Sequence, residues 1–154
     1  MNMPNLFPVF ELPAVLAEDT IATNPRFPRA PLFDIESGDF FLAGSKQMLY
    51  GSGYDSWLLW CTKTIMTQRW AHFAYSSNAG IEAEEAFLEI YRKAVESAFE
   101  RTITEALLAD PMRRATLVRD FIFDWQGGGE SLYITCAVIG ADGSQATIHA
   151  SWRP

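Results

Sequence analysis

The sequence has few of the residues on which most catalytic and metal sites depend. It contains two histidines and two cysteines in 154 residues. Two thiols cannot build a disulfide framework in a chain of this length, and neither Cys61 nor Cys136 has the spacing of a zinc site. We therefore expect both thiols to be reduced and the protein to fold in a reducing, cytoplasmic compartment.

Positive charge and long apolar runs are also scarce. Twelve Lys and Arg oppose nineteen Asp and Glu, which gives a formal net charge of −7. Nucleic acids and anionic lipids are bound through clustered cations, so neither is expected as the main partner. No apolar run approaches the roughly 18 residues that a bilayer requires. No lysine or arginine precedes Arg26, so we expect neither a membrane span nor a signal peptide.

The motifs of common enzyme classes are missing as well. The chain has no G-x-S-x-G, H-E-x-x-H, Walker or G-x-G-x-x-G pattern. His149 and Cys136 fall on opposite faces of neighbouring predicted strands, which argues against a Cys–His pair. We expect no catalytic residue, no cofactor and no metal. The enzymatic alternative is a cell-wall glycosidase that uses Glu82 or Glu85 with a partner acid, although we expect these glutamates to be solvated.

What the chain does have is apolar and aromatic side chains, at 49% and 14% of the residues, enough for the core of one domain. Six of the eight prolines lie in residues 1–31, which we expect to form an extended arm before a single domain of residues 32–154. The apolar side chains of this arm can lie across the chain's own domain or dock on a neighbour. They are Leu6, Phe7, Val9, Phe10, Leu12, Val15 and Leu16.

Hydrophobic periodicity predicts the elements of the domain. Residues 32–42 have the pattern of a hairpin that turns at Gly38. A helix capped by Asp55 or Ser56 is expected at about 56–68. From residue 83 an apolar stripe with a period of 3.6 continues to about 109, where Pro111 forces a stop, and this predicts one long helix.

After Pro111 the period changes to two. Three alternating runs follow, over 117–125, 132–139 and 145–152, with turns at Gly127–Gly129 and at 140–144. This pattern predicts a three-stranded antiparallel meander with one apolar face, covered by the long helix. The fold class is therefore α+β.

Several short motifs, in a fixed order from about residue 28 to 152, resemble a known family. It is the family of small baseplate wedge proteins of contractile phage tails that initiate the tail sheath, with some members labelled lysozyme-like. The sequence is most similar to the branch found in myoviruses and defective prophages. The family has an aromatic residue directly before the glycine that matches Gly80, and this chain has Ala79 at that position. The matching residues are Asp34 and Gly38; Thr67, Arg69 and Trp70; Tyr75, Ser76, Gly80 and Glu82; Glu105, Ala106, Leu107 and Asp110; and Val118, Asp120 and Phe121.

The resemblance implies a structural role in the virion. Six copies would sit in the tail baseplate around the tail tube, one per wedge, after assembly in the cytoplasm of the host bacterium. The partners would be the tail sheath protein, the larger baseplate wedge proteins and the tail tube. Sheath subunits are similarly thought to link by lending strands to neighbouring sheets. We therefore expect the final strand to pair, through main-chain hydrogen bonds, with a strand of the sheath protein.

Nine residues are candidates for protein interfaces. Arg113 and Arg114 can cap their own helix or pair with the carboxylates of a partner. Arg69 and Trp70 can form a junction between helix and sheet or contact a partner. A ligand-binding module, the remaining alternative, would need a deep aromatic pocket in place of a flat sheet edge. The full set is Arg69, Trp70, Tyr75, Arg113, Arg114, Gln145, Thr147, His149 and Ser151.

Overall fold

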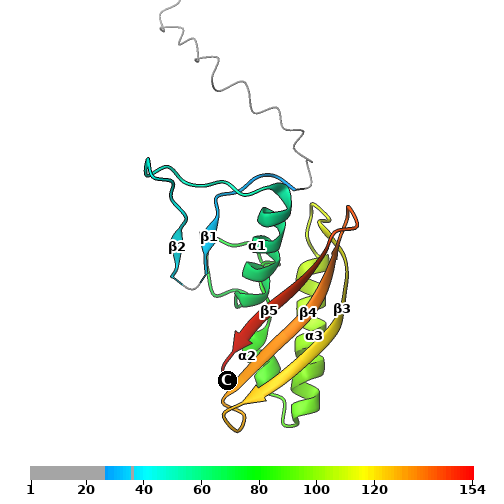
Figure 1. Cartoon of the computed structure of the whole chain (residues 1–154). Helices are drawn as coiled ribbons and strands as arrows, with labels where there is room; N and C mark the ends of the chain where they lie inside the picture. Colours follow the sequence, from blue (N-terminus) through cyan, green and yellow to red (C-terminus); the bar gives the residue numbers. More distant parts are fainter. Residues whose placement is uncertain (1–26, 36) are drawn as a thin grey trace, which may run out of the picture.

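The chain has the predicted α+β fold (Figure 1). Its main sheet consists of β3 (Ala115–Gln126), β4 (Ser131–Gly140) and β5 (Gln145–Trp152), antiparallel and in that order. The structure is a computed structural model that describes residues 27–35 and 37–154. Most of the predicted N-terminal arm lies outside the described residues, so its conformation stays a prediction.

The predicted hairpin at residues 32–42 is present and lies away from the three-stranded sheet (Figure 1). In it, β1 (Phe33–Asp34) pairs with β2 (Asp39–Phe40) in antiparallel register. The rings of Phe33 and Phe40 meet edge to face with their centroids 5.2 Å apart. Gly38 has a φ of 73°, a conformation that the turn requires and that costs glycine little.

The first helix, α1 (Gly53–Met66), begins earlier than the predicted residue 56. Asp55 and Ser56 were wrong as N-cap residues, because Ser52 takes that position. The Ser52 hydroxyl accepts a hydrogen bond from the Asp55 backbone N–H at 3.2 Å, and the Asp55 carboxylate accepts one from the Ser52 N–H at 3.0 Å. This reciprocal pair satisfies two donors at the helix start, which explains why the helix begins within the Gly-Ser-Gly segment.

The prediction of one helix over residues 83–109 was wrong. The structure has α2 (Ala83–Phe87) and α3 (Arg92–Leu108) instead. The ring of Phe87 lies 5.0 Å from the ring of Phe99, whereas twelve residues of one straight helix would separate them by about 18 Å. The chain therefore turns back after α2, so that α2 packs against α3.

The turn between α2 and α3 is stabilised by a hydrogen bond, and it leaves two large apolar side chains exposed. The Glu82 backbone N–H donates a hydrogen bond to the Thr102 hydroxyl at 2.9 Å, twenty positions along the chain. The turn exposes side chains that the 3.6-residue stripe had placed on the buried face. Ile90 is 88% exposed and Tyr91 is 75% exposed. Both lie at the corner between the helices, where they face solvent.

The three predicted strands are confirmed, but β3 changes phase along its length. The sequence alternation groups Leu117 with Phe121 on one face. In the structure the register with β4 shifts between Arg119 and Ile122. Asp120, at this bulge, has a φ of 57°, which aspartate tolerates better than most residues. As a result Leu117 is exposed and Val118 is buried.

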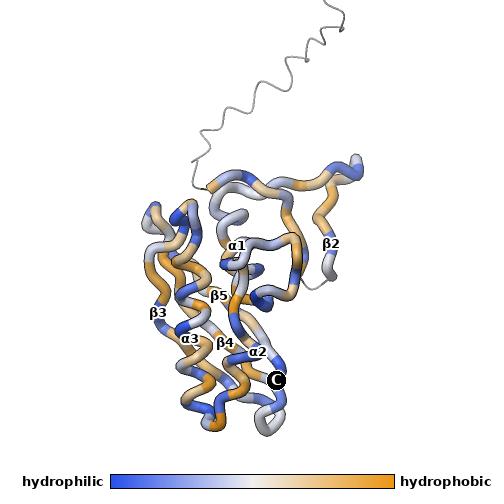
Figure 2. Tube along the Cα trace, turned by 180° about the vertical axis from the view of Figure 1, so that it is seen from behind, coloured by the Kyte–Doolittle hydropathy of each residue, from blue (hydrophilic) through white to orange (hydrophobic). Residues whose placement is uncertain are grey.

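Two helices share the inner face of the sheet. The buried side chains of α1 and of α3 join those of β4 and β5 in one hydrophobic core. Hydrophobic residues follow the strands and recur along α3 between hydrophilic ones (Figure 2). No helix of the described residues lies over the outer face of the sheet, where Ile122 is 63% exposed. Within the described part of the chain, none of the helices has the length and apolar character needed to cross a membrane.

Candidate functional site: the open edge of the sheet

The strand β5 forms one edge of the sheet, and alternate residues of it direct their backbone groups away from β4. The Gly140 N–H donates to the Ser144 carbonyl at 2.7 Å, which fixes the phase of the hydrogen-bonded pairs. Because such pairs alternate along an antiparallel ladder, every second residue of β5 bonds to β4. The outward residues are Gln145, Thr147, His149 and Ser151. These four are the β5 residues singled out from the sequence.

The open edge of β5 lacks the features that normally protect sheet edges. From Gln145 to Trp152 it has no proline and no charged side chain, and its register with β4 is continuous. The opposite edge, β3, is interrupted by two register shifts and has charged side chains at Arg119, Asp120 and Asp124. Bulges and charges discourage strand pairing. The two edges are therefore unequal, and β5 is the one suited to accept another strand.

Helix α1 runs along β5 and closes the beginning of its edge. The Tyr54 hydroxyl donates a hydrogen bond to the Gln145 carbonyl oxygen at 3.2 Å. At the other end the indole N–H of Trp152 donates to the Ile65 carbonyl at 3.1 Å. The N–H and C=O groups of Thr147, His149 and Ser151 remain on the outward side, and all three residues are exposed. The His149 ring nitrogen Nδ1 lies 3.0 Å from the Thr135 hydroxyl, across the outer face of the sheet.

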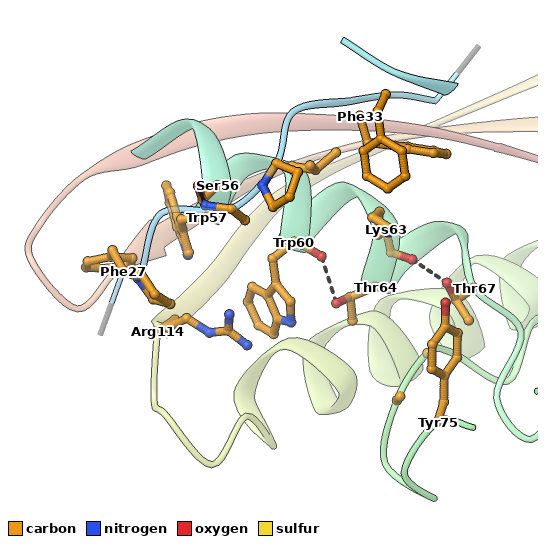
Figure 3. A pocket seen from close by; sticks show the side chains of 17 residues that line it. Phe27, Phe33, Ser56, Trp57, Trp60, Lys63, Thr64, Thr67, Tyr75 and Arg114 are labelled. Carbon is orange, nitrogen blue, oxygen red and sulfur yellow. Dashed lines mark hydrogen bonds between the residues drawn. The ribbon is translucent and has the colours of Figure 1, made fainter. Parts of the chain in front are cut away.

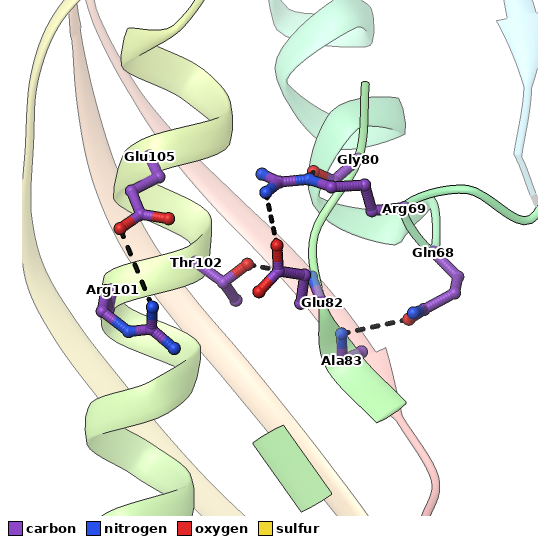
Figure 4. Close-up of polar contacts among 8 residues, drawn as sticks. All are labelled: Gln68, Arg69, Gly80, Glu82, Ala83, Arg101, Thr102 and Glu105. Atoms are coloured by element: carbon purple, nitrogen blue, oxygen red, sulfur yellow. Dashed lines mark hydrogen bonds and ion pairs between the residues drawn. The ribbon is translucent and has the colours of Figure 1, made fainter. Parts of the chain in front are cut away.

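Arg69 joins the end of α1 to the start of α2 (Figure 4). Its guanidinium contacts the Glu82 carboxylate at 2.6 Å and the Gly80 carbonyl at 3.1 Å. Next to it, the Gln68 side-chain oxygen accepts a hydrogen bond from the Ala83 N–H at 3.0 Å. Arg69 is thus held by contacts within the chain, although they join two helices and not a helix and the sheet as predicted.

Two further interface candidates, in the segment after Arg69, have exposed side chains. Trp70 is 62% exposed and Tyr75 is 51% exposed. The ring of Tyr75 meets that of His72 edge to face, with centroids 5.2 Å apart. Both candidates are therefore accessible to a partner, while Arg69 is committed to contacts within the chain.

The two arginines after α3 are placed differently. Arg114 binds the Asp110 carboxylate through Nε at 2.8 Å and Nη2 at 3.1 Å, and its guanidinium lies 4.0 Å from the centre of the Trp60 ring. Arg113 has a φ of 51° and is exposed, and its side chain makes no ion pair with the described residues. Arg114 thus serves the end of its own helix, and Arg113 is the arginine available to a partner.

The acidic residues do not form a paired site. Glu82 is bound to Arg69, and Glu85 is exposed on α2. No group of three potential metal-ligating side chains occurs among residues 27–35 and 37–154. Cys61 and Cys136 are buried free thiols, and burial raises the pKa of each to about 12. The thiols are therefore protonated and unreactive at neutral pH.

An aromatic groove on the outer side of α1 was not predicted from the sequence (Figure 3). Its volume is about 560 Å³. Four segments distant in the chain form it, namely residues 27–33, the outward face of α1, the loop at 75–80, and Arg114, together with Phe40. Its aromatic lining consists of Phe27, Phe33, Phe40, Trp57, Trp60 and Tyr75, and Lys63 lies among them. Local sequence patterns could not predict the groove, because its walls come from segments that are far apart in the sequence and meet only in the folded chain.

A family model described as contractile injection system sheath initiator matches residues 29–143, which is 115 of the 154 residues. The match ends just before β5 begins. No curated protein matches the chain.

Proposed function

The chain belongs to the family of contractile injection system sheath initiators, and from this we propose that it is a structural component of the tail baseplate that starts sheath assembly by accepting a strand at β5. The observation that carries this proposal is the open edge of β5. That edge has no proline, charged side chain or register shift between Gln145 and Trp152, and it is exposed at Thr147, His149 and Ser151. The incoming strand comes from the tail sheath protein in this proposal.

The energetics show what strand addition needs. Three outward residues offer two backbone groups each, and a net hydrogen bond contributes roughly 0.5–1.5 kcal/mol. Association costs roughly 4–15 kcal/mol in lost translational and rotational freedom. Backbone pairing alone can therefore fix the direction and register of the incoming strand, but it does not give a stable complex. Further contacts must stabilise it. Tyr133, exposed on the outer face of β4, is the apolar side chain nearest to the added strand, whereas Leu117 and Ile122 are on β3 and could contact only a more distant part of the partner.

Other partners in the proposal occupy other surfaces. We place the larger baseplate wedge proteins against Trp70 and Arg113, the candidates outside β5 whose side chains are exposed and do not line the aromatic groove. Six copies would surround the tail tube, one per wedge. Large exposed aromatic groups and arginine are the residues that most often anchor protein interfaces.

Catalysis is not part of the proposed function. A glycosidase needs two carboxyl groups in different environments across a substrate cleft. Glu82 is instead held by Arg69, Glu85 is exposed, and neither lines the aromatic groove. We expect the purified protein to release no product from peptidoglycan, with a Glu85→Gln variant as its reference.

The test of strand addition compares two substitutions at each of two outward positions, Thr147 and His149. His149→Pro and Thr147→Pro remove an outward N–H and leave the β4 ladder intact, which edge strands tolerate. The matched variants, His149→Ala and Thr147→Ala, remove the same side chains and keep the N–H groups. We expect baseplates with the double proline variant to nucleate little or no sheath in electron micrographs, and baseplates with the double alanine variant to nucleate it normally.

A second measurement needs no variant. The amides of Thr147, His149 and Ser151 should exchange with solvent rapidly in the isolated protein and become protected when sheath protein is added. Normal sheath growth on the folded double proline variant, or unchanged exchange at these three amides in assembled tails, would show that β5 is not the acceptor.

A further inference from the structure

We propose that the aromatic groove is the docking site of the chain's own N-terminal segment, residues 4–16. This inference goes beyond the proposed function and does not depend on strand addition at β5. The groove lies on the outer side of α1, whereas the open edge lies along β5. The two surfaces can therefore be tested separately.

The groove begins where the described chain begins. Phe27 is 5% exposed and its ring meets that of Trp57 edge to face, with centroids 5.9 Å apart. Three residues further along the chain, the Ala30 N–H donates a hydrogen bond to the Ser56 hydroxyl of α1 at 2.8 Å. Figure 3 shows Phe27 at one end of the groove, Trp60 in the middle and Tyr75 at the other end. The preceding residues are thus tethered at the rim of the groove.

The chemistry of the walls fits a proline-containing apolar segment. Aromatic-lined grooves bind such segments because proline presents a rigid apolar ring and restricts the unbound chain. Residues 4–16 contain three prolines, at 4, 8 and 13, and seven large apolar side chains. These prolines and apolar side chains match the aromatic walls of the groove.

Charge is complementary as well. No Asp or Glu lines the groove, and its lining includes Lys63 and Arg114. Arg114 is already paired with Asp110. The Lys63 ammonium lies 5.0 Å from the centre of the Phe33 ring and makes no ion pair with the described residues. Residues 1–25 contain three acids, Glu11, Glu18 and Asp19, and no lysine or arginine, so a docked segment would bring a carboxylate toward Lys63.

The connecting chain is long enough for docking within one molecule. Residues 17–26 can span at most about 35 Å when extended. The wall of the groove formed by α1 and its C-cap residue, from Ser56 to Thr67, is about 17 Å long. The chain can therefore turn back from the rim, and because an extended chain rises about 3.1 Å per residue, five or six of residues 4–16 can lie in the groove at one time.

The test uses the full chain with a photo-crosslinking amino acid, p-benzoylphenylalanine, in place of Tyr75. Tyr75 lines the groove and is half exposed, so the substitution should leave the fold intact. The matched control carries the same group in place of Tyr133, which is 44% exposed on the outer face of the sheet. We expect mass spectrometry to find crosslinks from position 75 to residues 4–16 and none from position 133 to that segment.

Isotope mixing identifies the origin of the segment. In a mixture of 14N- and 15N-labelled protein, docking within one molecule joins only peptides with the same label. Crosslinks between unlike labels would mean that the segment comes from a second copy, and crosslinks from position 75 only to other parts of the chain would mean that another occupant fills the groove. Either result overturns the proposal. Substituting Phe7 and Phe10 together by Asp should reduce the crosslink yield at least tenfold, and an unchanged yield would also count against it.

Discussion

The Asp110 carboxylate is enclosed by Arg114, which donates two hydrogen bonds from its guanidinium, at 2.8 and 3.1 Å, and a third from its backbone N–H at 3.0 Å. The two residues lie on either side of the turn from α3 to β3. The Arg114 guanidinium also lies over the ring of Trp60, on α1. One ion pair therefore holds three elements together, and its side chains are only 4% and 16% exposed.

Removing one partner of this pair should destabilise the domain strongly. We expect Asp110→Asn to lower the free energy of unfolding by roughly 3–5 kcal/mol, because it leaves a buried guanidinium without its counter-charge. The measurement is urea denaturation followed by circular dichroism. The control is Glu105→Gln, which breaks the exposed pair with Arg101 at 3.9 Å (Figure 4) and should change stability by less than about 1 kcal/mol. Equal effects of the two substitutions would contradict the structural role of Asp110.

The same pair predicts how stability depends on pH. Burial alone would raise the pKa of Asp110, but hydrogen bonds and charge from Arg114 outweigh it and lower that pKa below its usual value. The unfolded chain therefore binds a proton more readily than the folded chain. The stabilisation is fully present above the unfolded pKa, near 3.9, and is lost as the pH falls through the lower folded pKa. Wild type and Asp110→Asn should consequently differ most at neutral pH and converge below about pH 4, in denaturation curves measured across this range.

The turn between α2 and α3 gives a prediction with a neighbouring control. Phe87 packs against Phe99 and, with centroids 6.4 Å apart, against Trp125. We expect Phe87→Ala to cost about 2–3 kcal/mol, since Phe87 is only partly buried and large-to-small changes in a full core cost more. Leu88 is 81% exposed, so Leu88→Ala should stay within about 0.5 kcal/mol of wild type. If thermal unfolding shows no difference between these variants, α2 does not fold back on α3 in solution.

Gly80 is required by both its conformation and its surroundings. Its φ is 90°, and a Cβ there would collide with the Thr67 carbonyl oxygen. That oxygen cannot move away easily, because it accepts a hydrogen bond from the Ile81 N–H at 2.9 Å. Gly128 has a φ of 74° but nothing within 4 Å of a Cβ. Gly128→Ala should therefore cost about 1–2 kcal/mol for the backbone alone, and Gly80→Ala clearly more. Similar melting temperatures for the two variants would show that the contact with Thr67 is absent.

Local patterns predicted the elements whose boundaries depend on nearby residues. The three C-terminal strands and the hairpin follow from alternation and turn glycines, and both are confirmed. The break after α2 could not be predicted in this way, because residues 83–109 contain neither glycine nor proline. What breaks the helix is a contact of Phe87 with Phe99 and of Glu82 with Thr102. Such contacts exist only once the chain has folded.

The same distinction applies to the candidate site. The alternation that predicts β5 also assigns Gln145, Thr147, His149 and Ser151 to one side of it, so the sequence was sufficient to single them out. The bulge at Asp120, which makes β3 the protected edge, has no local signature. The aromatic groove has none either, because segments from residue 27 to residue 114 meet in it. Sequence reasoning therefore indicated which residues could pair, and the structure added which edge is open and what lies beside it.

The hydrogen bond from Tyr54 to Gln145 gives a last prediction, about the length of the open edge. The Tyr54 hydroxyl occupies the first outward carbonyl of β5, at 3.2 Å. Tyr54→Phe removes one partly exposed hydrogen bond and should cost the isolated protein no more than about 1.5 kcal/mol. It also leaves the Gln145 carbonyl available to an incoming strand. We therefore expect sheath nucleation on Tyr54→Phe baseplates to be at least as fast as on wild type.

Tyr50→Phe is the control, because Tyr50 is 53% exposed and its hydroxyl makes no hydrogen bond with the described residues. Slower nucleation by folded Tyr54→Phe, with Tyr50→Phe unchanged, would mean that the hydroxyl itself contacts the sheath and that the acceptor surface extends onto α1.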